Sequence, residues 1–97
     1  MSVVVVGGND RMAARYKEVC REYRCKAKVF TQMPCDFEKQ IGSPDLMVVF
    51  TDTVSHKMVR VVNRRSEKGN IPVVRIHSAG IAALKRVLDE ASGIKTN

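Results

Sequence analysis

Long apolar segments are absent from the 97-residue chain, and acidic and aromatic side chains are scarce. No stretch reaches the roughly 18 uncharged apolar residues that a membrane-spanning helix needs. The apolar opening, Ser2 to Val6, is too short for the core of a signal peptide. These absences argue against a membrane or secreted protein, and we expect a soluble protein of the cytoplasm.

The few aromatic residues limit one mode of nucleic-acid binding. There are five of them, two tyrosines and three phenylalanines. Only Tyr16 and Tyr23 lie in a basic segment, and their helical spacing places them on the apolar side of a predicted helix. Stacking of bases on exposed rings is therefore poorly supported, whereas contacts to phosphates stay open.

Cysteine is also sparse, and its pattern is uninformative for a metal site. Cys20, Cys25 and Cys35 include no pair separated by two residues. An odd number would leave one thiol unpaired in any disulfide scheme. The sequence therefore predicts free thiols, buried or half-buried, in a reducing compartment.

Acidic residues number 10 against 17 lysines and arginines, which gives a formal charge of +7. Twelve of the basic residues fall in two segments, seven in Arg11 to Lys28 and five in Lys57 to Lys68. An excess of this size favours an anionic partner, such as nucleic acid or an acidic protein. The alternative is that each segment is simply the solvated face of a helix.

The length predicts one domain, residues 1–97, with a thin core. A core of that size has no room for a large internal cavity, although a surface cleft is compatible with it. No serine, cysteine or aspartate is arranged with a histidine as a nucleophile with its base. We therefore expect that the protein is not an enzyme.

Two apolar runs without polar alternation, Ser2 to Val6 and Leu46 to Phe50, indicate strands covered on both faces. Two further strands are predicted. Lys26 to Thr31 alternates between faces, and Ile71 to Ile76 has Pro72 near its start, which suits a sheet edge.

Helical signals separate these strands. Caps and apolar spacing predict helices after Asn9 or Asp10, up to Ile41, from Val54 to near Gly69, and after Ser78 as the cap. Alternating strands and helices predict a parallel sheet. We expect a small flavodoxin-like α/β fold of four strands in the order 2-1-3-4 with helices on both faces. Its two edge strands and thin core also predict a homodimer.

Ligands of open parallel sheets bind at the carboxyl ends of the strands, where the strand order reverses. That point lies between the first and third strands, and helix N-termini directed at it would favour an anion. The residues expected to line it are Gly7, Gly8, Asn9, Asp52, Ser55, His56 and Ser78. Two alternatives stay open: Gly7 and Gly8 provide only a tight turn, and Asp52 only caps a helix.

His56 and His77 are the two imidazoles of the chain, and the predicted fold places both near the same site. They are candidate ligands for a metal ion or for haem iron. Capping or core roles are the alternative for each. A domain this thin cannot enclose a porphyrin, so haem would need an exposed groove or a dimer interface.

Three segments resemble the bacterial domain-of-unknown-function 2325 family: Val6 to Gly8, Asp45 before the third strand, and above all Thr51 to His56, TDTVSH. The resemblance covers the chain from Val3 to about Leu88 in the same order. Its most specific part is TDTVSH.

The resemblance implies a small cytosolic flavodoxin-like module with a loose association with haem or iron biology. Asp52, Ser55 and His56 carry over directly onto the family pattern. Many relatives carry a cysteine near Phe50 and another where this chain has Arg64 to Ser66. Loss of these thiols argues against a cysteine-based metal site.

The sequence thus supports two hypotheses of different classes. The first is a non-catalytic module that binds a small anionic ligand, with haem or a metal as possibilities, at the carboxyl edge of the sheet. The alternative is a basic interaction protein that binds nucleic acid or an acidic protein partner.

Overall fold

The structure, a computed structural model, describes residues 1–92. In chain order the elements are β1 (Ser2–Val6), the 3-10 turn η1 (Asp10–Met12), α1 (Ala13–Glu22), β2 (Lys26–Phe30), α2 (Phe37–Ile41), β3 (Leu46–Phe50), α3 (His56–Gly69), β4 (Val73–Ile76) and α4 (Ile81–Ser92). The tail after Ser92, for which the sequence predicts fraying, lies outside the described residues. Among residues 1–92, no helix is both long and apolar enough to cross a membrane.

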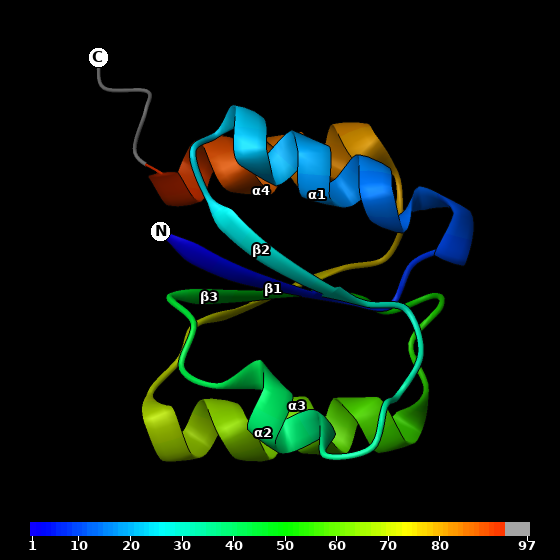
Figure 1. Cartoon of the computed structure of the whole chain (residues 1–97), viewed down its shortest axis with the longest axis vertical. Helices are drawn as coiled ribbons and strands as arrows, with labels where there is room; N and C mark the ends of the chain where they lie inside the picture. Colours follow the sequence, from blue (N-terminus) through cyan, green and yellow to red (C-terminus); the bar gives the residue numbers. More distant parts are fainter. Residues whose placement is uncertain (93–97) are drawn as a thin grey trace.

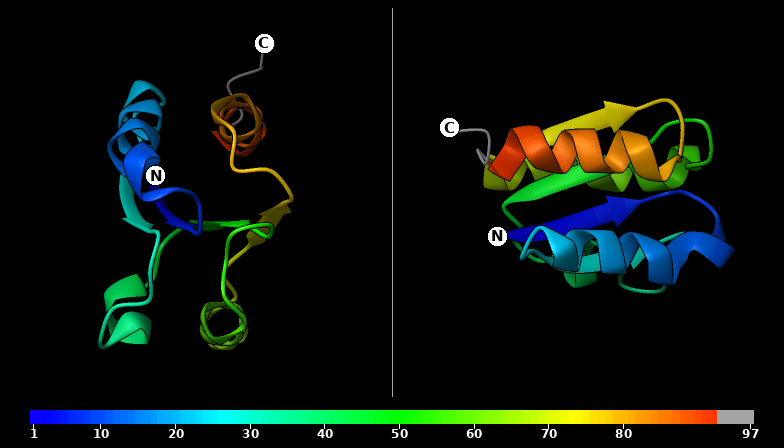
Figure 2. Two further views of the ribbon diagram at one scale, coloured as in Figure 1. Left: turned by 90° about the vertical axis from the view of Figure 1, so that its right-hand side faces the viewer. Right: turned by 90° about the horizontal axis from the view of Figure 1, so that it is seen from above.

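The strands form one parallel sheet in the order β2-β1-β3-β4. Figure 1 shows α1 and α4 over one face of the sheet and α2 and α3 over the other, and Figure 2 shows the same layers from two further directions. The predicted fold, a four-stranded flavodoxin-like sheet in the order 2-1-3-4 with helices on both faces, is confirmed.

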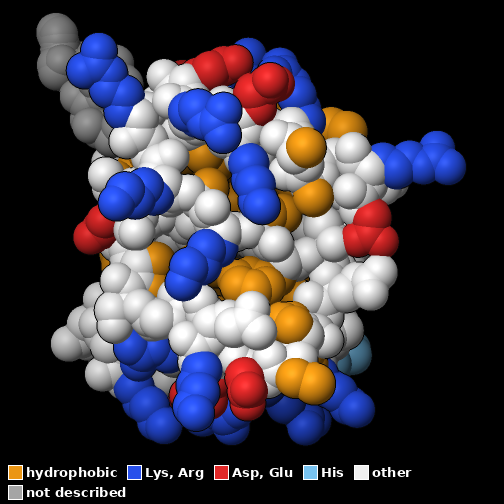
Figure 3. Space-filling model, in the orientation of Figure 1, with side chains coloured by type: hydrophobic (Ala, Val, Ile, Leu, Met, Phe, Trp, Pro, Cys, Tyr) orange, Lys and Arg blue, Asp and Glu red, His pale blue; other side chains and the backbone are white. Residues whose placement is uncertain are grey.

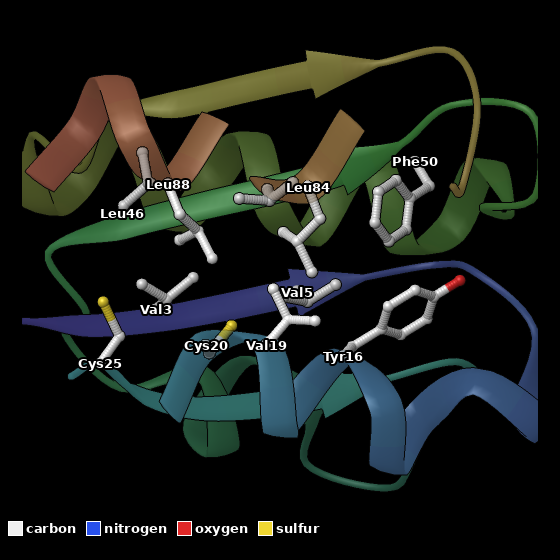
Figure 4. Close-up of a cluster of buried hydrophobic side chains, with 11 residues drawn as sticks. Val3, Val5, Tyr16, Val19, Cys20, Cys25, Leu46, Phe50, Leu84 and Leu88 are labelled. Carbon is white, nitrogen blue, oxygen red and sulfur yellow. The ribbon is translucent and has the colours of Figure 1, made fainter. Parts of the chain in front are cut away.

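The two central strands are those with continuous apolar runs. Every side chain of β3 is buried, as is every valine of β1. Val3 and Val5 pack with Leu84 in the cluster beneath α1 and α4, which Figure 4 shows in close-up. Val4 and Val6 pack on the opposite face, toward α2 and α3. Covering on both faces explains why neither strand alternates with polar residues.

The edge strands are shorter than their predicted lengths. β2 ends at Phe30 rather than Thr31, and β4 begins at Val73 rather than Ile71. The Ile71 N–H instead donates to the Ser66 carbonyl at 3.1 Å, which closes the last turn of α3. The buried Ile71 side chain therefore anchors a helix end and not a strand.

The prediction that Ser78 caps the last helix is wrong. α4 begins at Ile81, and the Leu84 N–H donates to the Gly80 carbonyl at 3.2 Å. The residue whose carbonyl accepts the first helical bond is the cap, so Gly80 holds this position. Serine is a preferred cap, which is why the sequence favours Ser78, but glycine is also accepted at this position.

Candidate functional site

Loops that follow β1, β3 and β4 meet at the carboxyl ends of the strands. We call residues 7–10, 51–56 and 77–80 together the carboxyl rim. The Gly8 N–H donates to Thr53 Oγ1 at 2.7 Å, which joins the first loop to the second. The Asp52 N–H donates to the His77 carbonyl at 3.2 Å, which joins the second to the third. The structure therefore brings together the glycine pair and the TDTVSH segment, as the sequence predicts.

The glycine pair is required by the shape of the turn. Gly7 and Gly8 have φ angles of 97° and 88°, which side-chain-bearing residues rarely adopt. A Cβ on Gly8 would lie 2.7 Å from Cε2 of the buried Tyr16 ring, and one on Gly7 would lie 3.0 Å from the Phe50 carbonyl oxygen. The alternative that these glycines serve a tight turn is thus supported by the geometry.

The amides of this turn are already engaged within the protein. The Gly7 N–H donates to the Phe30 carbonyl at 2.9 Å, and the Gly8 N–H is held by Thr53. A phosphate cradle needs several free N–H groups directed at one point. These two amides are not available for one. Thr53 lies within TDTVSH, but the sequence does not predict it as a lining residue of this rim.

Ser55 and not Asp52 caps α3. The Ser55 hydroxyl accepts a hydrogen bond from the Met58 N–H at 3.2 Å, three residues further on. The alternative that Asp52 caps this helix is therefore wrong, because three residues separate Asp52 from the first helical residue. Its carboxylate is exposed at the rim.

The remaining rim residues on the β1 side also make local contacts. Asn9 Oδ1 accepts from the Arg11 N–H at 2.9 Å and caps η1. Asp10 accepts a hydrogen bond from the hydroxyl of Thr31, and from Gln32 Nε2 at 2.8 Å. With Asp10 and Asp52 both present, the rim carries two carboxylates, which oppose an anionic ligand electrostatically.

His56 and His77 are exposed at this same end of the sheet, His56 as the first residue of α3. Ser78, next to His77, is exposed as well. Among the described residues, no three histidine, cysteine, aspartate or glutamate side chains are grouped so that they could hold a metal ion. Metal or haem ligation by the two histidines stays a prediction.

Three hollows of the described surface lie elsewhere, around β2 and α2. One, of about 260 Å³, is lined by residues that include Lys26, Lys28 and Ile41. A second, of about 310 Å³, includes Lys17 and Lys28. A third, of about 410 Å³, is formed by Glu38, Lys39, Gly42, Arg65 and Lys68. None of the three is lined by His56, His77 or Asp52.

We call the surface around these hollows the basic face; its cations are Lys17, Lys26, Lys28, Lys39, Arg65 and Lys68. Figure 3 shows lysine and arginine side chains around apolar atoms, with few acids, on the side of the molecule where β2 lies in Figure 1. Three of these cations come from the first basic segment and two from the second. The fold therefore gathers parts of both segments on one surface.

Contacts between α2 and α3 place the second basic segment beside α2. Glu38 of α2 accepts from Arg64 Nε at 3.1 Å and lies 3.7 Å from Lys68 Nζ. Arg65 Nε donates to the Gly42 carbonyl at 2.6 Å. Lys39 lies outside both basic segments, and no sequence pattern marks it. It belongs to this face because it lines the same hollow as Arg65 and Lys68 of α3.

The family comparison agrees with these observations. The family model described as "Uncharacterized protein conserved in bacteria (DUF2325)" matches residues 2–91. The chain belongs to the DUF2325 family. No match was found among curated proteins or among solved structures. Membership thus confirms the relationship that TDTVSH suggested, and it assigns no activity.

The cysteines of this DUF2325 chain are free thiols, but the prediction that all three are buried or half-buried is wrong at Cys35. Cys20 on α1 and Cys25 directly before β2 are buried, and Cys35 is exposed. Burial raises the pKa of Cys20 to about 11, and burial also raises the pKa of Cys25. Both buried thiols therefore stay protonated at neutral pH and are poor nucleophiles and metal ligands.

The exposed His56 gives a direct comparison with its neighbour Ser55. His56→Ala should change the free energy of unfolding by no more than about 0.5 kcal/mol, because the side chain is exposed at the start of α3. Ser55→Ala should cost about 1 kcal/mol, since it removes the cap on Met58. Urea denaturation of both variants measures the difference. A loss larger for His56→Ala than for Ser55→Ala would show that the imidazole is structural.

Proposed function

We propose that this DUF2325 chain is a non-catalytic binding module that holds an anionic partner on its basic face. The observation that carries this proposal is the position of the hollows. All three are bordered by lysine or arginine side chains around β2 and α2. The carboxyl rim, by contrast, presents Asp10 and Asp52 and uses its glycine amides internally.

The electrostatics of the basic face support this reading. The single acid among its lining residues, Glu38, is close to both Arg64 and Lys68. Lys26 and Lys28 are exposed, and no acidic side chain forms an ion pair with either in the described part of the chain. An anion that reaches these lysines would therefore not have to displace an internal partner, apart from the Gln40 carbonyl that accepts from Lys28 Nζ at 2.8 Å. Several cations around one surface add their potentials and attract an anion more strongly than an isolated lysine does.

The proposal is tested by binding at varied salt. Fluorescence anisotropy with a labelled oligoglutamate and a labelled oligothymidylate measures the Kd between about 50 and about 300 mM NaCl. We expect binding of at least one of these polyanions, weakened steeply by salt. Lys26→Glu with Lys28→Glu should raise the Kd about tenfold or more, since it reverses two cations that border the same hollow.

Lys57→Glu with Arg60→Glu is the matched control. It lowers the net charge by the same amount, and both residues are exposed on α3 outside the three hollows. It should raise the Kd no more than about threefold, through the general field alone. Equal weakening by the two double variants, or no binding of either polyanion, would show that the basic face is not a binding surface.

A further inference from the structure

We infer that the free edge of β2 accepts an added strand, supplied by an extended acidic segment of a partner polypeptide. This inference rests on the proposed function and names the chemistry of the partner. Nucleic acid is the competing polyanion, and it has no means of pairing with a strand edge.

The backbone of β2 has unpaired groups directed outward. The Lys26 N–H donates to the Met1 carbonyl at 2.9 Å, and the Phe30 carbonyl accepts from the Gly7 N–H at 2.9 Å, so residues 26 and 30 face β1. Because the direction of these groups alternates along a strand, the N–H and C=O groups of Ala27 and Val29 point away from β1. β2 is the last strand on its side of the sheet, so no strand meets them.

A groove already follows this edge. The hollow of about 310 Å³ is lined by Ala27, Val29 and Phe30 of β2. Lys17 of α1 and Gln40 of α2 also line it. Its floor therefore includes both residues whose backbone groups face outward. Val29 and Phe30 are half-buried, which leaves apolar surface for the side chains of an added strand.

The lysines around this groove favour an acidic strand as its occupant. Lys26 and Lys28 lie two residues apart, hence on one face of the sheet, and Lys17 borders the other wall. Pairing of two β2 edges would place these lysines opposite one another, which disfavours a second copy of this chain. An added strand with acidic residues at every second position would instead meet them with opposite charge. A predicted homodimer would then have to use another surface.

Peptide binding tests the backbone and the charge separately. The probe is a fluorescein-labelled peptide with glutamate at alternate positions and threonine between them. Its control has the same sequence and charge, but N-methyl groups replace the hydrogens on the alternate amides that would bond to β2. We expect the N-methylated peptide to bind about tenfold or more weakly, because it cannot form the ladder.

Substitutions in β2 also test whether the peptide adds as a strand. Ala27→Pro removes an outward N–H while leaving the amides that bond β1 in place, and prolines are tolerated on edge strands. It should weaken the unmethylated peptide about tenfold, and Lys26→Glu with Lys28→Glu should do the same. If Ala27→Pro does not fold, exchange of the wild-type amides replaces it: the bound peptide should slow hydrogen exchange at Ala27 and Val29.

The outcomes separate the two levels of the proposal. Equal affinity for both peptides, with weakening by the lysine variant, overturns strand addition and leaves the basic face as a site for anions. Tighter binding of oligothymidylate than of the peptide at the same salt overturns the polypeptide partner. Absence of binding by every polyanion overturns the inference and the proposed function together.

Discussion

Gly8→Ala should lower the free energy of unfolding by about 2 to 6 kcal/mol, a large share of the stability of a domain of this size. Two costs add. The φ angle of 88° is unfavourable for any residue with a Cβ, at about 1 to 3 kcal/mol. The new Cβ would also lie 2.7 Å from Tyr16 Cε2 and 2.8 Å from its hydroxyl oxygen. That ring is fully buried, so it cannot move aside without disturbing the core, at about 1 to 3 kcal/mol.

Gly42→Ala is the matched control for the backbone cost. Gly42 also has a positive φ, 67°, but a Cβ there would meet only Lys28 Nζ, at 3.9 Å. Urea denaturation of the two variants should therefore give a larger loss for Gly8→Ala, by at least about 1 kcal/mol. Equal losses would mean that backbone strain accounts for both and that Tyr16 does not limit the space at Gly8.

The central part of the fold follows from apolar patterning alone. The runs Ser2 to Val6 and Leu46 to Phe50 are strands whose side chains are covered on both faces, and this places them in the middle of the sheet. The strand order then follows from the edge character of the other two. The starts of β4 and α4, which the sequence placed at Ile71 and after Ser78, could not be predicted in the same way. The end or cap of an element depends on backbone direction as well as on residue type.

The candidate sites were less predictable for a physical reason. Thr53 bonds an amide 45 residues away in sequence, and nothing in a local pattern marks that pairing. Lys39 joins the basic face only because α2 lies against α3, where Glu38 contacts Arg64. α2 has only five residues, and a hollow remains beside it that is lined in part by Lys26, Ala27 and Lys28 of β2.

The two candidate regions differ in what they leave unsatisfied. At the carboxyl rim, the amides of Gly7 and Gly8 and the side chains of Asn9 and Asp10 all have partners within the chain. At β2, the outward backbone groups have no strand beside them. Binding to the turn at Gly7 and Gly8 would require exchange of existing contacts, whereas binding at β2 would add contacts. This difference favours β2 as the surface that a partner completes.

Both regions depend on one buried ring, that of Tyr16. Its centroid lies 5.2 Å from that of Phe50, and its hydroxyl donates to the Ala79 carbonyl at 2.9 Å (Figure 4 shows the two rings). The ring supports the turn at Gly8 from below and fixes the loop after β4 through Ala79. α1 in turn packs on β2.

Tyr16→Ala should therefore destabilise the protein by about 3 to 5 kcal/mol, because it removes a fully buried aromatic ring and leaves a cavity. Tyr16→Phe keeps the ring and loses only the bond to Ala79, at about 1 kcal/mol. Thermal melts should show this as a fall of at least about 12 °C for Tyr16→Ala and about 4 to 8 °C for Tyr16→Phe. Similar losses for the two variants would mean that the hydroxyl, and not the packing of the ring against Phe50, anchors α1 to the sheet.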